Sequence, residues 1–130
     1  MRCTINLQSF DDLPMSRKQI AMRAILEALV VANWNYLIEH DVPRLDVWLK
    51  NGGVRLQREP SETWLDIPSI IALGSAGQKD LACWRVAELR HDGEDDVAPF
   101  ISVTYAGDAA IYRIGVRRGM KVEWFDGADR

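Results

Sequence analysis

Hydrophobic side chains in the first third of the chain recur at spacings of three and four, and this pattern predicts a helix over residues 16–39. Ser16 and Gln19 have the spacing of a capping box, which opens a helix. Pro43 ends the helical stretch, because the residue before a proline avoids helical backbone angles. The side chains expected to face the core are Met22, Ile25, Leu26, Leu29, Val30, Asn33, Leu37 and Ile38.

The same helix carries small and apolar residues on a second side. A helix that is apolar on more than one side is often buried against a partner as well as against its own core. The pattern therefore predicts a contact surface formed by Ala21, Ala24, Ala28, Val31, Ala32 and Trp34.

The middle of the chain predicts short elements separated by glycine and proline. An edge strand is expected over residues 3–8, a helical turn over 44–50, a half-exposed strand over 54–58 and a short apolar segment over 67–73. A longer helix is expected over residues 79–91. Its buried side includes Leu81, Ala82, Trp84, Val86 and Leu89.

The last third of the chain predicts a sheet. Residues 97–105, 110–117 and 120–125 are rich in β-branched and aromatic side chains, and the links between them are short. Such links favour an antiparallel meander. Because helices come first and strands afterwards, the sequence predicts an α+β fold with N-terminal helices packed on a C-terminal antiparallel sheet.

Composition narrows the class of protein. At 130 residues, with 48% hydrophobic residues and five tryptophans, residues 1–130 are expected to form a single domain with its own core. The net charge of -3 disfavours a nucleic-acid partner, which normally binds a basic surface. No apolar run approaches the roughly 18 residues of a membrane span, and the N-terminus lacks the apolar core of a signal peptide. We expect no membrane contact and synthesis in the cytoplasm.

Cysteine and histidine are too sparse to indicate a metal site or a disulfide framework. Cys83 lies within the second long helix, where a small buried thiol is the expected state. His40 and His91 both fall at helix ends, where an imidazole commonly caps carbonyl groups. The sequence predicts neither a metal ion nor a cofactor.

Residues 74–90, GSAGQKDLACWRVAELR, form a loop of small residues that runs directly into a helix. A thiol hydrolase places its cysteine at such a junction, where the positive end of the helix stabilises a thiolate. The junction residue in this chain is Gln78.

Several segments in this order resemble the transglutaminase-like, papain-fold cysteine peptidase domains predicted in tailed-phage genomes. The likeness spans about residues 54–126, and its specificity comes from the combination of motifs. They are Gly53-Val54-Arg55, Arg58-Glu59-Pro60, Trp64-Leu65-Asp66-Ile67-Pro68, Gly74, the LAxWRxAELR helix within residues 79–90, and residues 112–118.

The resemblance implies a papain/transglutaminase-like fold with its catalytic residues replaced. In such families a cysteine at the helix start is the nucleophile, a histidine on a strand is the base, and an aspartate on the next strand orients the imidazole. In this chain Gln78 stands at the cysteine position, Arg113 at the histidine position, and Asp126 remains as the third member. A primary amide is a poor nucleophile, and arginine stays protonated with a pKa above about 12. The resemblance therefore implies a chain that is not an enzyme.

Two arrangements of these vestigial positions stay open. Arg113 and Asp126 form an ion pair across adjacent strands, with the Gln78 amide joined to it, or Arg113 points into solvent on an outer face. Cys83 lies five residues beyond Gln78, about 140 degrees around the helix, and is not expected to reach the cleft.

The function expected from the resemblance is a non-catalytic structural or assembly protein, a virion component assembled in the host cytoplasm. Minor capsid, capsid-stabilising and head-to-tail joining roles all fit. Its partners would be other virion or assembly proteins, in an oligomeric context. The first interaction candidates are Trp34, Trp48 and Trp124.

Two alternatives stay open beside this function. One is an active thiol hydrolase or transamidase with a rearranged site that uses Cys83 or Cys3. The other is a module that holds a peptide in the old cleft, for example by adding it to a sheet edge.

Overall fold

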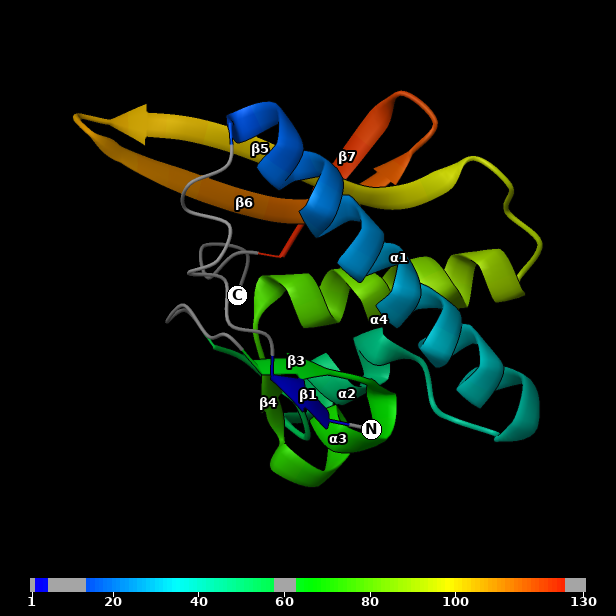
Figure 1. Cartoon of the computed structure of the whole chain (residues 1–130). Helices are drawn as coiled ribbons and strands as arrows, with labels where there is room; N and C mark the ends of the chain where they lie inside the picture. Colours follow the sequence, from blue (N-terminus) through cyan, green and yellow to red (C-terminus); the bar gives the residue numbers. More distant parts are fainter. Residues whose placement is uncertain (1, 5–13, 58–62, 126–130) are drawn as a thin grey trace.

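The computed structural model describes residues 2–4, 14–57 and 63–125 of the chain (Figure 1). In chain order its elements are β1 (Arg2–Thr4), α1 (Met15–Glu39), α2 (Leu45–Asn51), β2 (Arg55–Leu56), β3 (Thr63–Leu65), α3 (Ile67–Leu73), β4 (Ser75–Ala76), α4 (Gln78–His91), β5 (Val97–Ala106), β6 (Ala109–Arg118) and β7 (Lys121–Trp124).

The strands of the last third form one antiparallel sheet in the order β5-β6-β7, which confirms the predicted meander. β5 and β6 pair along their whole length, and Gly107 takes a φ of 63° in the turn between them. A glycine with positive φ at the first central position suits a two-residue type II′ hairpin turn. Together with the helices, this sheet gives the α+β fold that the element order predicted.

Helix α4 lies at the centre of the molecule, between the meander and the short elements of the middle segment (Figure 1). All of its residues from 80 to 89 are buried except Arg85. On the meander side α4 and α1 pack against β5 and β6, and on the other side α4 packs against α2, α3 and β3. One helix thus contributes to two hydrophobic cores.

The two cores share no residue. The sheet core consists of Met22, Leu26, Leu29, Val30, Trp64, Ala82, Cys83, Val86, Ala87, Leu89, Val97, Ile101, Ile114 and Val116. The base core consists of Leu45, Val54, Leu65, Ile67, Ile70, Ala76, Leu81 and Trp84.

The N-terminal cap of α1 differs from the prediction, whereas its C-terminal cap matches it. The helix starts at Met15 after Pro14, so Ser16 is already its second residue, and no side chain caps this end. The predicted capping box is therefore wrong. At the other end the His40 ring stacks on Tyr36, and its Nδ1 lies 3.1 Å from the Tyr36 carbonyl oxygen, which confirms the expected carbonyl cap.

The second side of α1 faces outward. Ala24, Ala28 and Val31 are exposed there, while Ala21, Ala32 and Trp34 are partly buried. Ile38, expected in the core, is 62% exposed, so that expectation is wrong. It follows Ile20 by eighteen residues, which is five helical turns, and therefore lies on the same outward side.

The segment over residues 67–73 folds as helix α3, a type of element that the sequence pattern did not assign. Asp66 caps it by accepting hydrogen bonds from the Ser69 backbone N–H at 3.2 Å and the Ser69 hydroxyl at 2.7 Å. Gly74 ends the helix with a φ of 75°. Seven residues carry too few turns for an apolar period to be visible.

The predicted edge strand over residues 3–8 and half-exposed strand over residues 54–58 are each described only in part. β1 pairs antiparallel with β3, with Cys3 opposite Trp64, and residues 5–8 lie outside the described residues. β2 pairs in parallel with β4, and residue 58 also lies outside them.

We predict that Gly115→Ala destabilises the meander. A Cβ at this position would lie 2.5 Å from the Glu123 carbonyl oxygen and 2.7 Å from the Trp124 ring. Hydrogen bonds between β6 and β7 hold the two backbones together, so they cannot move apart to make room for the Cβ. The free energy of unfolding should therefore fall by about 1–3 kcal/mol or more in urea titrations.

The matched control is Gly77→Ala, where the nearest atoms would lie 3.6 Å away and φ is -81°. It should cost no more than about 1 kcal/mol, the difference between glycine and alanine before a helix. Equal losses in the two variants would show that the close approach at Gly115 is not the cause.

Candidate functional site

The start of α4 is the position where the sequence placed the vestigial nucleophile. Gln78 is the first residue of the helix, after Gly77. Its side-chain Oε1 accepts a hydrogen bond of 3.5 Å from the backbone N–H of Ile114 in β6. β7 pairs with β6 only from Gly115 to Arg118, so Ile114 is the next residue along that edge. Gln78 thus satisfies a backbone donor at the point where β7 ends.

Arg113 is adjacent to this contact in the chain but its side chain lies on the other face of the sheet. Ile114 is buried in the sheet core, and side chains alternate along a strand, so Arg113 faces away from α4. Its guanidinium lies 4.0 Å from the centre of the Trp124 ring, which also makes an edge contact with Phe100. The side chains of Gln78 and Arg113 therefore do not contact each other across the sheet; Gln78 contacts the β6 backbone at Ile114, the residue after Arg113.

The expected ion pair of Arg113 with Asp126 falls outside the described residues, because Asp126 is one of the last five residues. Strand alternation places Arg113 on the outer face of the sheet, and this placement is compatible with both expectations. Stacking on Trp124 adds an aromatic partner that the sequence did not indicate.

Cys83 is fully buried in the sheet core, as expected. Its Sγ lies 3.4 Å from the Leu26 carbonyl oxygen, to which the thiol donates. Burial, with Asp80 and Glu27 adding to it, raises the pKa of this thiol well above its ordinary value. A thiol in this state is protonated near neutral pH and is a poor nucleophile. The side chain of Cys3 is outside the described part of the molecule.

Asp80, next to the vestigial position, is a buried carboxylate that sequence analysis did not single out. It accepts hydrogen bonds from the backbone N–H of Leu65 at 3.0 Å and of Gly77 at 3.2 Å. Lys79 lies 3.4 Å away, and the Lys79 ammonium also lies over the Trp64 ring at 5.3 Å. Burial nevertheless raises the pKa of Asp80. The carboxylate ties the start of α4 to β3.

Glu88 makes the corresponding connection two turns later. Its Oε2 accepts a hydrogen bond of 2.7 Å from the backbone N–H of Leu45, the first residue of α2. Arg85 lies 3.5 Å from the other oxygen, and burial is the main cause of the raised pKa of this carboxyl. The only sequence signal for these two contacts was the spacing of the carboxylates: Asp80 is the third residue of the helix, and Glu88 follows it by eight residues.

The three tryptophans proposed as interaction residues are all partly buried. Trp34 packs against the sheet core and Trp48 against the base core. The Trp48 indole N–H donates to the Pro43 carbonyl oxygen at 3.2 Å. Trp124 lies between Arg113 and Phe100. Each ring already makes intramolecular contacts that restrain it.

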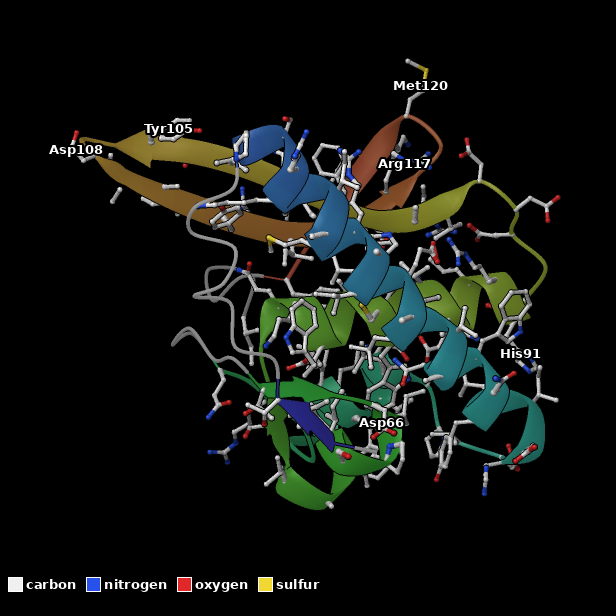
Figure 2. The ribbon with its side chains drawn as sticks, in the orientation of Figure 1. Asp66, His91, Tyr105, Asp108, Arg117 and Met120 are labelled. Carbon is white, nitrogen blue, oxygen red and sulfur yellow. The ribbon has the colours of Figure 1, made fainter. Side chains whose placement is uncertain are left out.

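Other large apolar side chains are more exposed than these tryptophans. Met120 is the most exposed of those described, Ile20 and Ile38 are exposed on α1, and two more lie on the β5-β6 hairpin. β7 pairs with β6 only as far as Gly115, so residues 102–113, which we call the hairpin arm, consist of two strands. The arm extends past the body of the molecule, with Tyr105 and Asp108 at its far end (Figure 2). Tyr105 is 64% exposed and Ile111 is 49% exposed. Strand alternation puts these two side chains on opposite faces of the arm.

A polar groove lies at the other end of the meander. It is lined by Glu94, Asp95, Asp96, Arg118, Gly119, Lys121, Val122 and Glu123. Arg118 pairs with both Glu94 and Glu123, and acidic side chains outnumber basic ones in the lining. Among the described residues, no three His, Cys, Asp or Glu side chains are grouped so as to hold a metal ion.

In comparisons with known proteins, no family model matches the chain, and no curated protein or solved structure matches it either. Of the helices in the described ranges, none has the length and apolar character to cross a membrane.

We predict that Asp80→Asn changes how stability depends on pH. The folded protein holds the Asp80 proton more tightly than the unfolded chain, because burial raises the pKa. The stability from this site is therefore fully present below the ordinary pKa of 3.8 and is lost as pH rises through the folded pKa. In urea titrations above about pH 4, the variant's free energy of unfolding relative to the wild type should rise with pH.

Asp92→Asn is the control with the opposite sign. The hydrogen bond from Arg44 lowers the pKa of Asp92, so its contribution is present above 3.8 and is lost as pH falls through the folded pKa. Relative to the wild type, this variant should lose stability as pH rises towards 3.8. Slopes of the same sign in both variants would contradict the assignment.

Proposed function

We propose that this protein is a non-catalytic structural or assembly protein, a component of a phage virion or phage-derived particle, on a degenerate papain/transglutaminase-like scaffold. Its partners are other virion or assembly proteins, and its place is in the particle after assembly in the host cytoplasm. The observation that carries the assembly role is the hairpin arm, which exposes Tyr105 and Ile111 on its two faces.

The hairpin arm supports an assembly role because two strands alone are marginally stable in water. Between Ser102 and Arg113 the described chain supplies no third strand, and the tip residues are exposed. A projecting element of this kind gains stability when another surface covers it. Apolar residues on both faces suit a contact that buries the arm from two sides.

The chemistry of the α4 start supports the absence of catalysis. Gln78 accepts a backbone hydrogen bond, and Arg113 stacks on Trp124. Neither group performs the work of a nucleophile or of a base. The buried Cys83 thiol argues against the alternative of a rearranged thiol hydrolase at that residue.

The papain-like scaffold rests on the sequence resemblance, and one feature of the fold supports it. In the family pattern, a loop of small residues leads into the nucleophile helix, and the base is carried by a strand. In this chain, residues 75–77 lead into α4, whose first residue contacts β6 at Ile114.

The first test is the reactivity of Cys83. In a Cys3→Ser background, Cys83 should react with an aromatic disulfide reagent roughly a thousandfold or more slowly in native protein than in urea, because labelling requires unfolding. The control is Cys83→Ala, in which Cys3 is the remaining thiol. Rapid native labelling of Cys83 below pH 7 would reveal a poised thiolate and would support the hydrolase alternative.

The second test restores the family residues. The alignment requires Gln78→Cys combined with Arg113→His to label faster at pH 7 than Gln78→Cys alone, by about tenfold for each unit by which histidine lowers the thiol pKa. The structure predicts equal labelling, because the side chain of residue 113 faces away from α4. Gln78→Cys with Arg117→His is the matched control, since it places histidine elsewhere on β6. Equal labelling of all three would count against the assignment of Arg113 to the histidine position.

A further inference from the structure

We propose that the outer edge of β5 pairs with the β5 edge of a second copy of this chain, in an antiparallel register with its two-fold axis at Val103. This contact gives the proposed assembly role a specific interface. Only the use of the dimer in a particle rests on the proposed function. Dimerisation itself is a property of the isolated protein.

The hydrogen-bonding direction of each β5 residue follows from three contacts. The Asp96 carbonyl accepts from the Gly119 N–H, which continues the β5-β6 ladder. The Val97 carbonyl instead accepts from the Arg90 guanidinium at 2.8 Å, so it points away from β6. The Ile114 N–H, opposite Ile101, points to the Gln78 side of β6. Even-numbered β5 residues therefore bond to β6, and odd-numbered ones face outward.

The outward-facing groups form a short, bounded set. Arg90 occupies the Val97 carbonyl, and Pro99 has no N–H to offer. Ile101, Val103 and Tyr105 follow, and the strand then ends at the turn that begins with Gly107. β5 is an edge strand in the described sheet, so three consecutive outward residues present unpaired donors and acceptors.

This set is symmetric about Val103, which is the argument for a second copy as the occupant. A two-fold axis there pairs Ile101 with Tyr105 of the second copy and Val103 with itself. All three outward residues on each strand then exchange both backbone hydrogen bonds. The next pair would join Pro99 to the turn at Gly107, so the ladder ends where the donors end.

Side chains and charge agree with this register. On one face Val103 meets its own copy and the exposed Tyr105 lies beside Ile101, while on the other Ser102 lies opposite Thr104, and such pairs stabilise antiparallel strands. β5 contains no charged residue, although natural edge strands usually carry charges that prevent pairing. At each end, the turn with Asp108 approaches the partner's Val97 terminus, where Arg90 lies paired with Glu27.

The test is sedimentation velocity of the purified chain and of Val103→Pro. The wild type should be a dimer, and Val103→Pro should weaken it by about tenfold or more, because each proline removes an N–H that serves only the dimer. Val103→Ala is the matched control: it loses a similar part of the side chain, retains the N–H and should remain a dimer. Far-ultraviolet circular dichroism should be alike in the three.

A second variant covers the case in which Val103→Pro does not fold. Tyr105→Lys changes a side chain that is 64% exposed, so the monomer should be unaffected, whereas the dimer should weaken because lysine would lie beside Ile101 of the second copy. Ile111→Lys, on the opposite face of the hairpin arm, should leave the dimer intact.

Cross-linking checks the register. In a Cys3→Ser background, Val103→Cys should be linked by a short bifunctional thiol reagent, because paired Cα atoms lie about 5.5 Å apart. Tyr105→Cys should not be linked, since the two cysteines would be four residues, roughly 13 Å, apart along the ladder.

A wild-type monomer at high concentration would overturn the proposal, as would a dimer that survives both Val103→Pro and Tyr105→Lys. In a monomer, slow amide exchange at Ile101, Val103 and Tyr105 would mean that another segment of the same chain covers the edge. A complex with an added peptide in place of self-association would identify the peptide-binding alternative. A dimer with a reactive active-site thiol would leave this proposal standing and remove the non-catalytic function.

Discussion

The burial of α4 is the constraint on which the rest of the structure depends. Nine of its residues are buried between two cores, and two of the nine are carboxylates, Asp80 and Glu88. Removing ionised carboxyl groups from water is costly unless hydrogen bonds replace the water. Both carboxyls accept a backbone N–H from a neighbouring element, Leu65 in β3 and Leu45 in α2. The burial of α4 therefore determines the positions of β3 and α2 as well as that of α4.

This arrangement gives a physical account of the loop and helix start that resemble a nucleophile segment. At the start of α4, Gly77 leads directly into the helix, and the polar groups of this junction make structural contacts. Asp80 binds the Gly77 N–H, and Gln78 binds the β6 edge at Ile114. Arg113 stacks on the far face with Trp124. The polar residues at the start of α4 thus connect this helix to β3 and to the meander.

The periodic elements were predictable from the sequence, because their signals are local. Residues 79–91 were expected as a helix and α4 spans Gln78–His91, and the three strands of the meander appear in the expected order. The burial of Cys83 and the cap by His40 followed from position in a helix. A short helix such as α3 has no visible period, and its cap at Asp66 becomes evident only from the backbone.

The candidate site was less predictable, because its contacts join residues far apart in the chain. Asp80 contacts Leu65 and Glu88 contacts Leu45 across separate elements, so the spacing of the two carboxylates along the helix did not identify their partners. Strand parity decides that Arg113 faces Trp124, and parity depends on the register with β5 and β7. The exposure of Tyr105 depends on where β7 ends, because the β5-β6 hairpin extends beyond the last residue of β6 that pairs with β7.

The function that we propose is that this chain belongs to an assembly and performs no catalysis there. If the proposed phage origin is right, the most direct measurement is quantitative mass spectrometry of particles purified from the system that encodes the chain. The account predicts that the chain is present in fixed stoichiometry with other virion proteins and stays bound through repeated gradient purification. Its absence from complete particles would contradict the account.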